Sequence, residues 1–252
     1  MNDLSNHTSR KGVIIMGFFT RIIQEYSRAK EDRTNEQIFK ADPKRSIEIA
    51  QLIDDTLGKH RTVWLMTDWH YLKYNRDTQM VFKRPGADRI IKNCKNLIKR
   101  DDVLIFLGDI CDGEVEKKNE IAEFLSQIPG IKIMIRGNND LFPDQWYLDH
   151  GFDRIVPKFV WKNILFSHRP QDNQMEYNIH GHIHGSHKYY KSEVSHYHNQ
   201  VDVGYFGGRE KPLELNWLIQ QAPKYMRSAK FVNHPWKNDP EVHNENIGGS
   251  SE

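Results

Sequence analysis

The segment His180–Gly185, which reads His-Gly-His-Ile-His-Gly, holds the side chains of this chain that are best suited to metal chemistry. Imidazole nitrogen is a good ligand for Mn, Fe, Zn, Co and Ni. Two imidazoles one residue apart, His182 and His184, are hard to explain by packing alone. The flanking glycines relax the backbone enough for neighbouring imidazoles to serve adjacent ions. The segment therefore predicts the last part of a metal site assembled from several loops.

Other polar clusters follow strand-like apolar runs. The runs at 62–67, 102–107 and 131–135 end in Asp68 with His70, in Asp109 and in Asn138, and a fourth run at 162–167 ends in His168. Sites in α/β proteins lie at the carboxyl ends of the strands. Four separate runs that each deliver polar side chains at that end favour one shared site.

The elements that must position these side chains form an alternating pattern. Apolar residues at helical spacing predict helices over 17–29, 43–58, 87–98 and 121–128, with Ile47, Ala50, Leu52, Ile53 and Leu57 as the core face of the second. Residues 71–86 are expected to form a loop, 154–160 one short strand, and 176–179 and 198–203 further strands. This order of strands and helices predicts the α/β class.

Composition sets the limits of the interpretation. The chain has 252 residues, of which 38% are hydrophobic and 28% charged, with a formal net charge of +2. This charge is too balanced to argue by itself for nucleic acid or membrane. No run approaches the roughly 18 apolar residues that span a bilayer, and two cysteines do not suggest a disulfide framework. We therefore expect a cytoplasmic protein without membrane insertion; composition leaves the oligomeric state open.

The five polar blocks together resemble the calcineurin-like metallophosphoesterase superfamily. They occur in the family's order over about residues 62–215, and the stretches 84–108 and 203–212 are most similar to small stand-alone phosphoesterases of bacteria and phages. The blocks are Asp68-x-His70, Gly108-Asp109, Gly137-Asn138-Asn139-Asp140, Ser167-His168 and Gly181-His182-Ile183-His184.

The resemblance implies a fold and a domain organisation. The fold is a four-layer sandwich in which two mixed β-sheets are flanked by helices. Residues 59–221 are expected to form this metallophosphoesterase domain. A helical extension, 1–58, would pack on or near it, and a polar, partly disordered tail, 222–252, would follow.

The resemblance also implies two divalent metal ions. Manganese is the expected metal, with Fe, Zn, Co or Ni as alternatives. The implied reaction is in-line attack of a metal-bridging hydroxide on a phosphate ester, with the ions about 3.5–4 Å apart. The first ion would be held by Asp68, His70, Asp109 and His184, and the second by the bridging Asp109 with Asn138, His168 and His182.

The third block departs from the family pattern at Asn139, where the family commonly has a histidine that protonates the leaving oxygen. An amide can donate a hydrogen bond but cannot deliver a proton at neutral pH. Three interpretations remain open. The substrate has a good leaving group, as in a phosphodiester or nucleotide; another group such as His180 or His187 takes over; or the protein is a catalytically weak or inactive binding or scaffold module.

Several residues beside the ligands carry weaker expectations. Asn139, Asp140 and Arg169 are the candidate catalytic residues, with Asp140 expected to orient its neighbour rather than to touch metal. Arg136 and Arg169 could each contact phosphate or form a supporting ion pair. Basic and aromatic residues alternate in the segment 71–86, which could hold a nucleotide or a nucleic-acid strand, or be a solvated loop; they are Tyr71, Tyr74, Arg76, Lys83 and Arg84.

Overall fold

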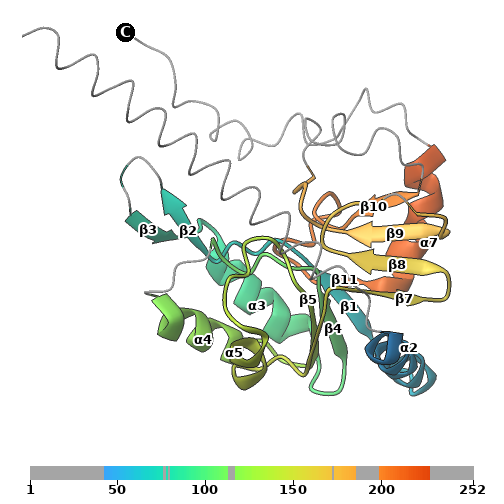
Figure 1. Cartoon of the computed structure of the whole chain (residues 1–252), viewed down its shortest axis with the longest axis horizontal. Helices are drawn as coiled ribbons and strands as arrows, with labels where there is room; N and C mark the ends of the chain where they lie inside the picture. The colour runs from blue at the N-terminus through green and yellow to red at the C-terminus, as the bar shows by residue number, and fades with distance from the viewer. Residues whose placement is uncertain are drawn as a thin grey trace, which may run out of the picture.

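The structure is a computed structural model that describes residues 43–75, 78, 80–112, 117–171, 173–185 and 199–227 (Figure 1). The helix predicted at 17–29, most of the N-terminal extension and the tail beyond 227 lie outside the described residues. Within the described part, no helix combines the length and the apolar character that crossing a membrane requires.

A five-stranded mixed sheet forms the centre of the domain, in the order β11-β1-β4-β5-β6. Four of its strands are parallel, and β11 pairs antiparallel with β1 at one edge. The parallel strands are almost wholly buried, which explains their continuous apolar sequences. The strands are β1 (Val63–Met66), β4 (Val103–Phe106), β5 (Ile131–Ile135), β6 (Arg154–Val156) and β11 (Leu213–Glu214).

A second, four-stranded mixed sheet has the order β10-β9-β8-β7. Strand β7 is antiparallel to β8, and the other pairs are parallel. Lys162 and Asn163 join β7 to β8 with φ of 44° and 62°, the left-handed conformation that a tight two-residue hairpin needs. The strands are β7 (Lys158–Trp161), β8 (Ile164–Ser167), β9 (Tyr177–His180) and β10 (Gln200–Asp202).

Two hydrophobic cores hold these layers together. One lies between the sheets, where Leu65 and Ile105 meet Phe166 and Ile179, and helices α2 (Pro43–Gly58) and α7 (Leu215–Arg227) border it. The other lies between the five-stranded sheet and helices α3 (Ala87–Leu97), α4 (Lys118–Ser126) and α5 (Asp144–Asp149). The predicted class, mixed sheets flanked by helices, is confirmed (Figure 1).

Three expectations about local structure differ from the structure. Residues 71–86 contain an antiparallel hairpin, β2 (Leu72–Asn75) with β3 (Met80–Lys83), rather than a loop. The strand expected over 154–160 is divided by Pro157 into β6 and β7, because proline lacks the N–H that a continuous ladder needs. In helix α2, Ile53 is buried and Ala50, Leu52 and Leu57 pack against the same core, as predicted, but Ile47 is 70% exposed and Ile49 is buried in its place.

Helix α7 continues through Arg227 and therefore runs past residue 221, where sequence analysis places the end of the domain. Cys94 and Cys111 are both buried and neither forms a disulfide, as expected of thiols that pack within a core. The domain boundaries themselves stay predictions.

Asp102 ties the start of β1 to the start of β4. Its buried carboxylate accepts hydrogen bonds from Thr62 N at 3.1 Å, Lys99 N at 2.9 Å and Trp64 Nε1 at 3.0 Å. Burial opposes its ionisation, but these hydrogen bonds keep the pKa of Asp102 below its usual value. The carboxylate therefore provides hydrogen bonds that join β1 and β4 at their amino-terminal ends, where strand pairing begins.

We predict that Asp102→Ala lowers the free energy of unfolding by about 2–3 kcal/mol, because it leaves three partly buried donors without their acceptor. The neighbouring variant Asp101→Ala, which loses an exposed pair with Arg61, should change it by less than about 1 kcal/mol. Urea unfolding of both variants at pH 7 provides the comparison. Since the folded pKa is lowered, the difference from wild type should shrink as pH falls below about 3.9. Equal effects of the two variants would contradict this role of Asp102.

Candidate metal centre

All the predicted ligands lie just beyond the carboxyl ends of five parallel strands. Asp68 and His70 follow β1, Asp109 follows β4 and Asn138 follows β5. In the other sheet, His168 follows β8, and His182 and His184 follow β9. Because parallel strands end at the same edge of a sheet, the two sheets bring these loops to one place.

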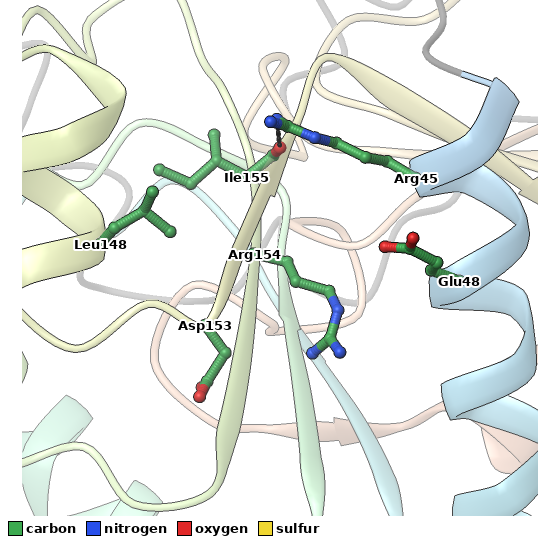
Figure 2. Close-up of a pocket in the computed structure, with 6 residues that line it drawn as sticks. All are labelled: Arg45, Glu48, Leu148, Asp153, Arg154 and Ile155. Carbon is green, nitrogen blue, oxygen red and sulfur yellow. Dashed lines mark hydrogen bonds between the residues drawn. The ribbon is translucent and has the colours of Figure 1, made fainter.

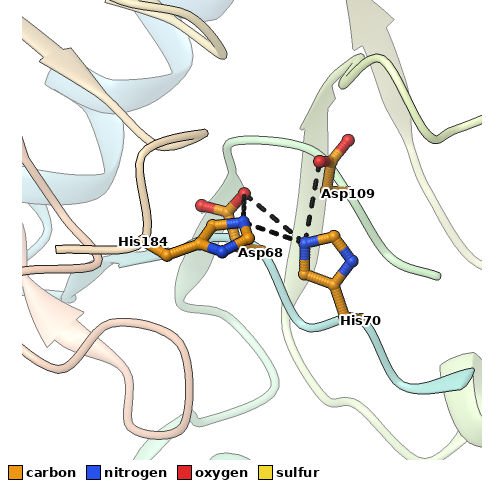
Figure 3. Close-up of side chains that lie close together, drawn as sticks. All are labelled: Asp68, His70, Asp109 and His184. Atoms are coloured by element: carbon orange, nitrogen blue, oxygen red, sulfur yellow. Dashed lines mark hydrogen bonds and ion pairs between the residues drawn. The ribbon is translucent and has the colours of Figure 1, made fainter. Parts of the chain in front are cut away.

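The first group consists of Asp68, His70, Asp109 and His184, whose ligand atoms all lie within 4.8 Å of one another (Figure 3). The Nε2 atoms of His70 and His184 are 3.0 Å apart. Asp68 Oδ1 is 3.2 Å from His184 Nε2, and Asp109 Oδ2 is 3.7 Å from His70 Nε2. Four donor atoms thus face one point from three different loops, those after β1, β4 and β9.

The second group shares Asp109 and adds His168 and His182, again within 4.8 Å. His168 Nε2 lies 3.2 Å from His182 Nδ1, 3.0 Å from Asn138 Oδ1 and 3.5 Å from Asp109 Oδ1. Asn138 therefore joins the second group through its amide oxygen. Each carboxylate oxygen of Asp109 faces a different group, which is the arrangement expected of a bridging ligand.

The donor set fits divalent cations. The Nδ1 atoms of His70 and His168 face the Asp112 carboxylate and the Leu107 carbonyl, so in the neutral imidazoles the proton lies on Nδ1 and the Nε2 lone pair faces the centre. The carboxylates of Asp68 and Asp109 are fully buried there, and buried carboxylates need a compensating positive charge. A mixture of imidazole nitrogen and carboxylate oxygen suits Mn, Fe, Co, Ni or Zn better than Mg or Ca.

The backbone of the ligand loops is unusual. Eight described non-glycine residues have positive φ, and five of them are predicted ligands: Asp68, His70, Asp109, His182 and His184. Left-handed backbone at such residues is unfavourable and collects at functional sites. Close packing adds a second demand, since a Cβ on Gly181 would lie 1.8 Å from Thr67 Oγ1, and one on Gly137 would lie 2.1 Å from Asp109 Oδ1. Only glycine fits at these two positions.

Burial and neighbouring charge shift the pKa values of these groups in opposite directions. Burial and the nearby cations His168 and Arg169 lower the pKa of His182 to about 3. Burial also works against protonation of His168, but the carboxylates of Asp109 and Asp68 raise its pKa. For Asp68, burial works against ionisation, yet the hydrogen bond from His184 and the surrounding imidazoles lower its pKa. His182 is therefore held neutral, as a metal ligand must be.

Asn139 faces the centre. Its backbone N donates to Asp109 Oδ1 and its Nδ2 donates to Asp109 Oδ2, both at 2.9 Å. The side chain at this position therefore reaches the shared carboxylate and lies next to both groups.

The candidates Asp140 and Arg136 have other partners. Asp140 is buried, and its carboxylate accepts from the backbone N of Asp109, Ile110 and Gly137 at 2.7–2.9 Å. Arg136 donates to Asp144 and to the Asp140 carbonyl and lies over the Tyr147 ring, which is the ion-pair alternative left open by the sequence. Asp140 thus positions the loops after β4 and β5.

Sequence analysis names His180 and His187 as possible replacements for the proton donor expected at position 139. His180 is completely buried, and burial lowers its pKa to about 4, so it is neutral and inaccessible to substrate. His187 lies outside the described residues. Arg169 lies close enough to His182 to affect its pKa and stays a candidate for a phosphate contact.

Sequence analysis missed Asp112, which contacts a predicted ligand. Its Oδ1 is 2.5 Å from His70 Nδ1, the nitrogen opposite the one that faces the centre. A carboxylate on the far nitrogen fixes the orientation and tautomer of a metal-binding imidazole. An acidic residue three positions after Asp109, following the same strand, was the available signal.

Comparisons with known proteins place this centre in a family. A profile described as calcineurin-like phosphoesterase matches residues 61–220, so the chain belongs to that family. An uncharacterized protein of Methanocaldococcus jannaschii is 24% identical over 173 residues, which cover 65% of this chain and 93% of that protein.

Two crystal structures are also similar. A protein of unknown function from Aquifex aeolicus is 21% identical with a TM-score of 0.45, and the match covers 63% of this chain and 98% of that one. A nuclease from Pseudomonas putida is 20% identical with a TM-score of 0.33, over 50% of this chain and 62% of that one.

We predict that Asp112→Ala weakens Mn²⁺ binding about 10–100-fold, the usual effect of removing the carboxylate behind a metal-bound imidazole. Isothermal titration of the full chain with Mn²⁺ measures it. Asp149→Ala, which removes an exposed carboxylate on α5, is the matched control and should leave the affinity unchanged. An unchanged affinity in Asp112→Ala would rule out this positioning role.

Proposed function

We propose that this chain is a dinuclear metal-dependent phosphoesterase that hydrolyses a phosphodiester or nucleotide-type substrate in the cytoplasm. The observation that carries the proposal is the convergence of two buried donor groups on Asp109. A binding or scaffold protein on this fold would have no reason to keep both groups together. Membership of a phosphoesterase family supports the reaction class.

Two divalent ions, with manganese as the proposed metal, would be held by the two groups. Bound there, they would supply a water of lowered pKa and positive charge for the phosphoryl oxygens. Asp109 would balance the charge of both ions, because each of its oxygens faces one group. Asp112 and Asp140 would keep His70 and Asp109 in place.

Asn139 supports the preference for a diester. Its amide can donate a hydrogen bond to a phosphoryl oxygen, and Arg169 can add positive charge beside His182. Neither group can give a proton to a departing alkoxide at neutral pH. The missing acid would cost about 10²–10⁴-fold on a poor leaving group, whereas an activated or stabilised leaving group needs it less.

Two ligand variants test the proposal. Asp109→Asn and His182→Ala should each lower the Mn²⁺-dependent hydrolysis of bis(p-nitrophenyl) phosphate by more than about 100-fold, since each removes a ligand rather than a supporting residue. His60→Asn changes an exposed imidazole at the opposite end of β1 and should retain full activity. If the wild-type chain hydrolyses no substrate in the presence of Mn²⁺, Fe²⁺, Zn²⁺, Co²⁺ or Ni²⁺, the proposed phosphoesterase function is rejected.

Restoring the histidine at position 139 tests the substrate preference. We expect Asn139→His to raise kcat for phenyl phosphate, whose leaving group is poor, about 10-fold or more, because a proton donor becomes available beside Asp109. Asn139→Ala is the control and should lower activity on monoesters and diesters alike. If Asn139→His leaves the monoesterase rate unchanged, the lack of this acid does not set the preference.

A further inference from the structure

The β2–β3 hairpin carries apolar side chains that neither core buries. Of the eight large apolar side chains that are exposed in the described part of the chain, three belong to this hairpin: Tyr74 at 38%, Met80 at 64% and Phe82 at 41%. The hairpin projects from the end of the domain beyond α3 and α4 (Figure 1). A cluster of this kind on a small ribbon is a typical mark of a binding surface.

The pairing register divides the hairpin into two faces. Leu72 pairs with Lys83 and Tyr74 with Val81, and Leu72 and Val81 pack against the core formed with α3 and α4. Successive side chains of a strand point to opposite faces. The other face therefore carries Lys73 directly opposite Phe82 and Asn75 directly opposite Met80. We call these four residues the outer face of the hairpin.

The outer face is connected to the metal centre through Asp112. This carboxylate bonds to His70 Nδ1 through Oδ1 and accepts from Tyr74 N through Oδ2 at 3.4 Å. Burial opposes the ionisation of Asp112, but the hydrogen bonds from His70 and Tyr74 N and the nearby charges of His70 and Lys73 lower its pKa, so the ammonium of Lys73 lies near this carboxylate. Lys73 follows His70 by three residues, which in an extended strand is about 10 Å. A few nucleotides of an extended strand cover that distance.

The charge of the segment favours an anionic partner. Residues 71–86 contain four cationic side chains and one acidic one. Lys83 pairs with Asp88 and Arg84 with Glu210, and the register places Lys73 directly opposite the exposed ring of Phe82. An aromatic ring, a thioether and a lysine on one flat ribbon match what single-strand binders use, namely stacking on bases and contact with phosphate. A duplex hides the base faces that such a surface needs.

We propose that the outer face of the β2–β3 hairpin binds single-stranded nucleic acid and directs one of its phosphodiesters to the metal centre. Phe82 stacks on a base, Met80 extends the apolar contact and Lys73 contacts the backbone. This inference rests on the proposed function for the identity of the substrate, but the binding surface itself is separable from catalysis.

A surface cavity of about 170 Å³ lies between α2 and β6 (Figure 2). Two arginines and two carboxylates line it, and Arg45 is directed to the Ile155 carbonyl at 3.2 Å. Its mixed charge favours no particular ligand, and it lies away from the ligand loops, so we base no proposal on it.

Fluorescence anisotropy with a labelled phosphorothioate oligothymidylate, which resists hydrolysis, tests the surface in the full chain. Phe82→Ala should raise Kd about 10-fold, as expected for the loss of one stacked base. Lys73→Gln should weaken binding and lower the slope of log K against log salt by about 0.7, because one phosphate contact is lost. A duplex of the same length should bind the wild-type chain more weakly than the single strand.

Matched controls lie on the far side of the domain. Ile47→Ala removes an exposed apolar side chain from α2, and Lys59→Gln removes an exposed cation; both should bind like wild type. The proposal is overturned if the wild-type chain does not bind the strand, or if Phe82→Ala and Ile47→Ala behave alike. It is also overturned if the duplex binds as well as the single strand, or if Met80 and Phe82 only hold two copies of the chain together in sedimentation experiments.

Hydrolysis of bis(p-nitrophenyl) phosphate separates this inference from the proposed function. The substrate is too small to reach the hairpin, so Phe82→Ala should keep kcat/KM within about twofold, the size of an effect from a distant site. Loss of strand binding with retained hydrolysis supports the surface. Strand binding that depends on Phe82 in a chain without any hydrolase activity would reject the proposed function and leave the surface intact. Hydrolysis by a chain that does not bind the strand would reject the binding surface and leave the proposed function intact.

Discussion

Left-handed backbone at five predicted ligands is the constraint on which the rest of the site depends. Each such residue costs on the order of 1–3 kcal/mol and persists only where its surroundings determine it. Here buried carboxylates provide those surroundings by accepting backbone N–H groups. Asp140 holds the amide of Asp109, Asp68 holds that of His182 at 2.9 Å, and Asp202 holds that of Gly185 at 2.7 Å. The ligand loops of the two sheets are thereby fixed before any ion binds.

These same carboxylates place several negative charges close together in a buried region, where ionised groups are unfavourable. Burial, with the nearby charge of Asp68, raises the pKa of Asp202 to about 7, and burial with Asp109 raises that of Asp140. Burial likewise disfavours ionised Asp68, which His184 and other imidazoles stabilise. Positive charge at the centre would relieve all of them together, so the supporting residues and the ligands favour the same occupant. The framework that orients the ligands thus also creates the need for cations.

Sequence patterns predicted the main strands because buried parallel strands read as continuous apolar runs, as in β4 and β5. They located the seven ligand candidates because strand ends coincide with polar blocks. They failed where tertiary contacts decide. Leu72 and Val81 make 71–86 a hairpin by packing on a distant core, and the burial of Ile49 in place of Ile47 depends on where α2 crosses the sheets. Asp112 was missed because its role exists only through a contact with His70, 42 positions earlier.

Asp112 also joins two parts of the molecule that the sequence leaves separate. One of its oxygens orients His70, and the other accepts a hydrogen bond from the backbone N–H of Tyr74 on the hairpin. A ligand that shifts strand β2 must therefore also act on the imidazole that faces the centre. The coupling requires no distant pathway, because a single carboxylate contacts both elements. A histidine at position 139 would place a proton donor next to Asp109, where the Asn139 amide donates a hydrogen bond. With Asn139 in that place, the proposed function makes discrimination between substrates depend more on how the substrate strand is held, and the outer face of the hairpin is the surface that we propose for that contact.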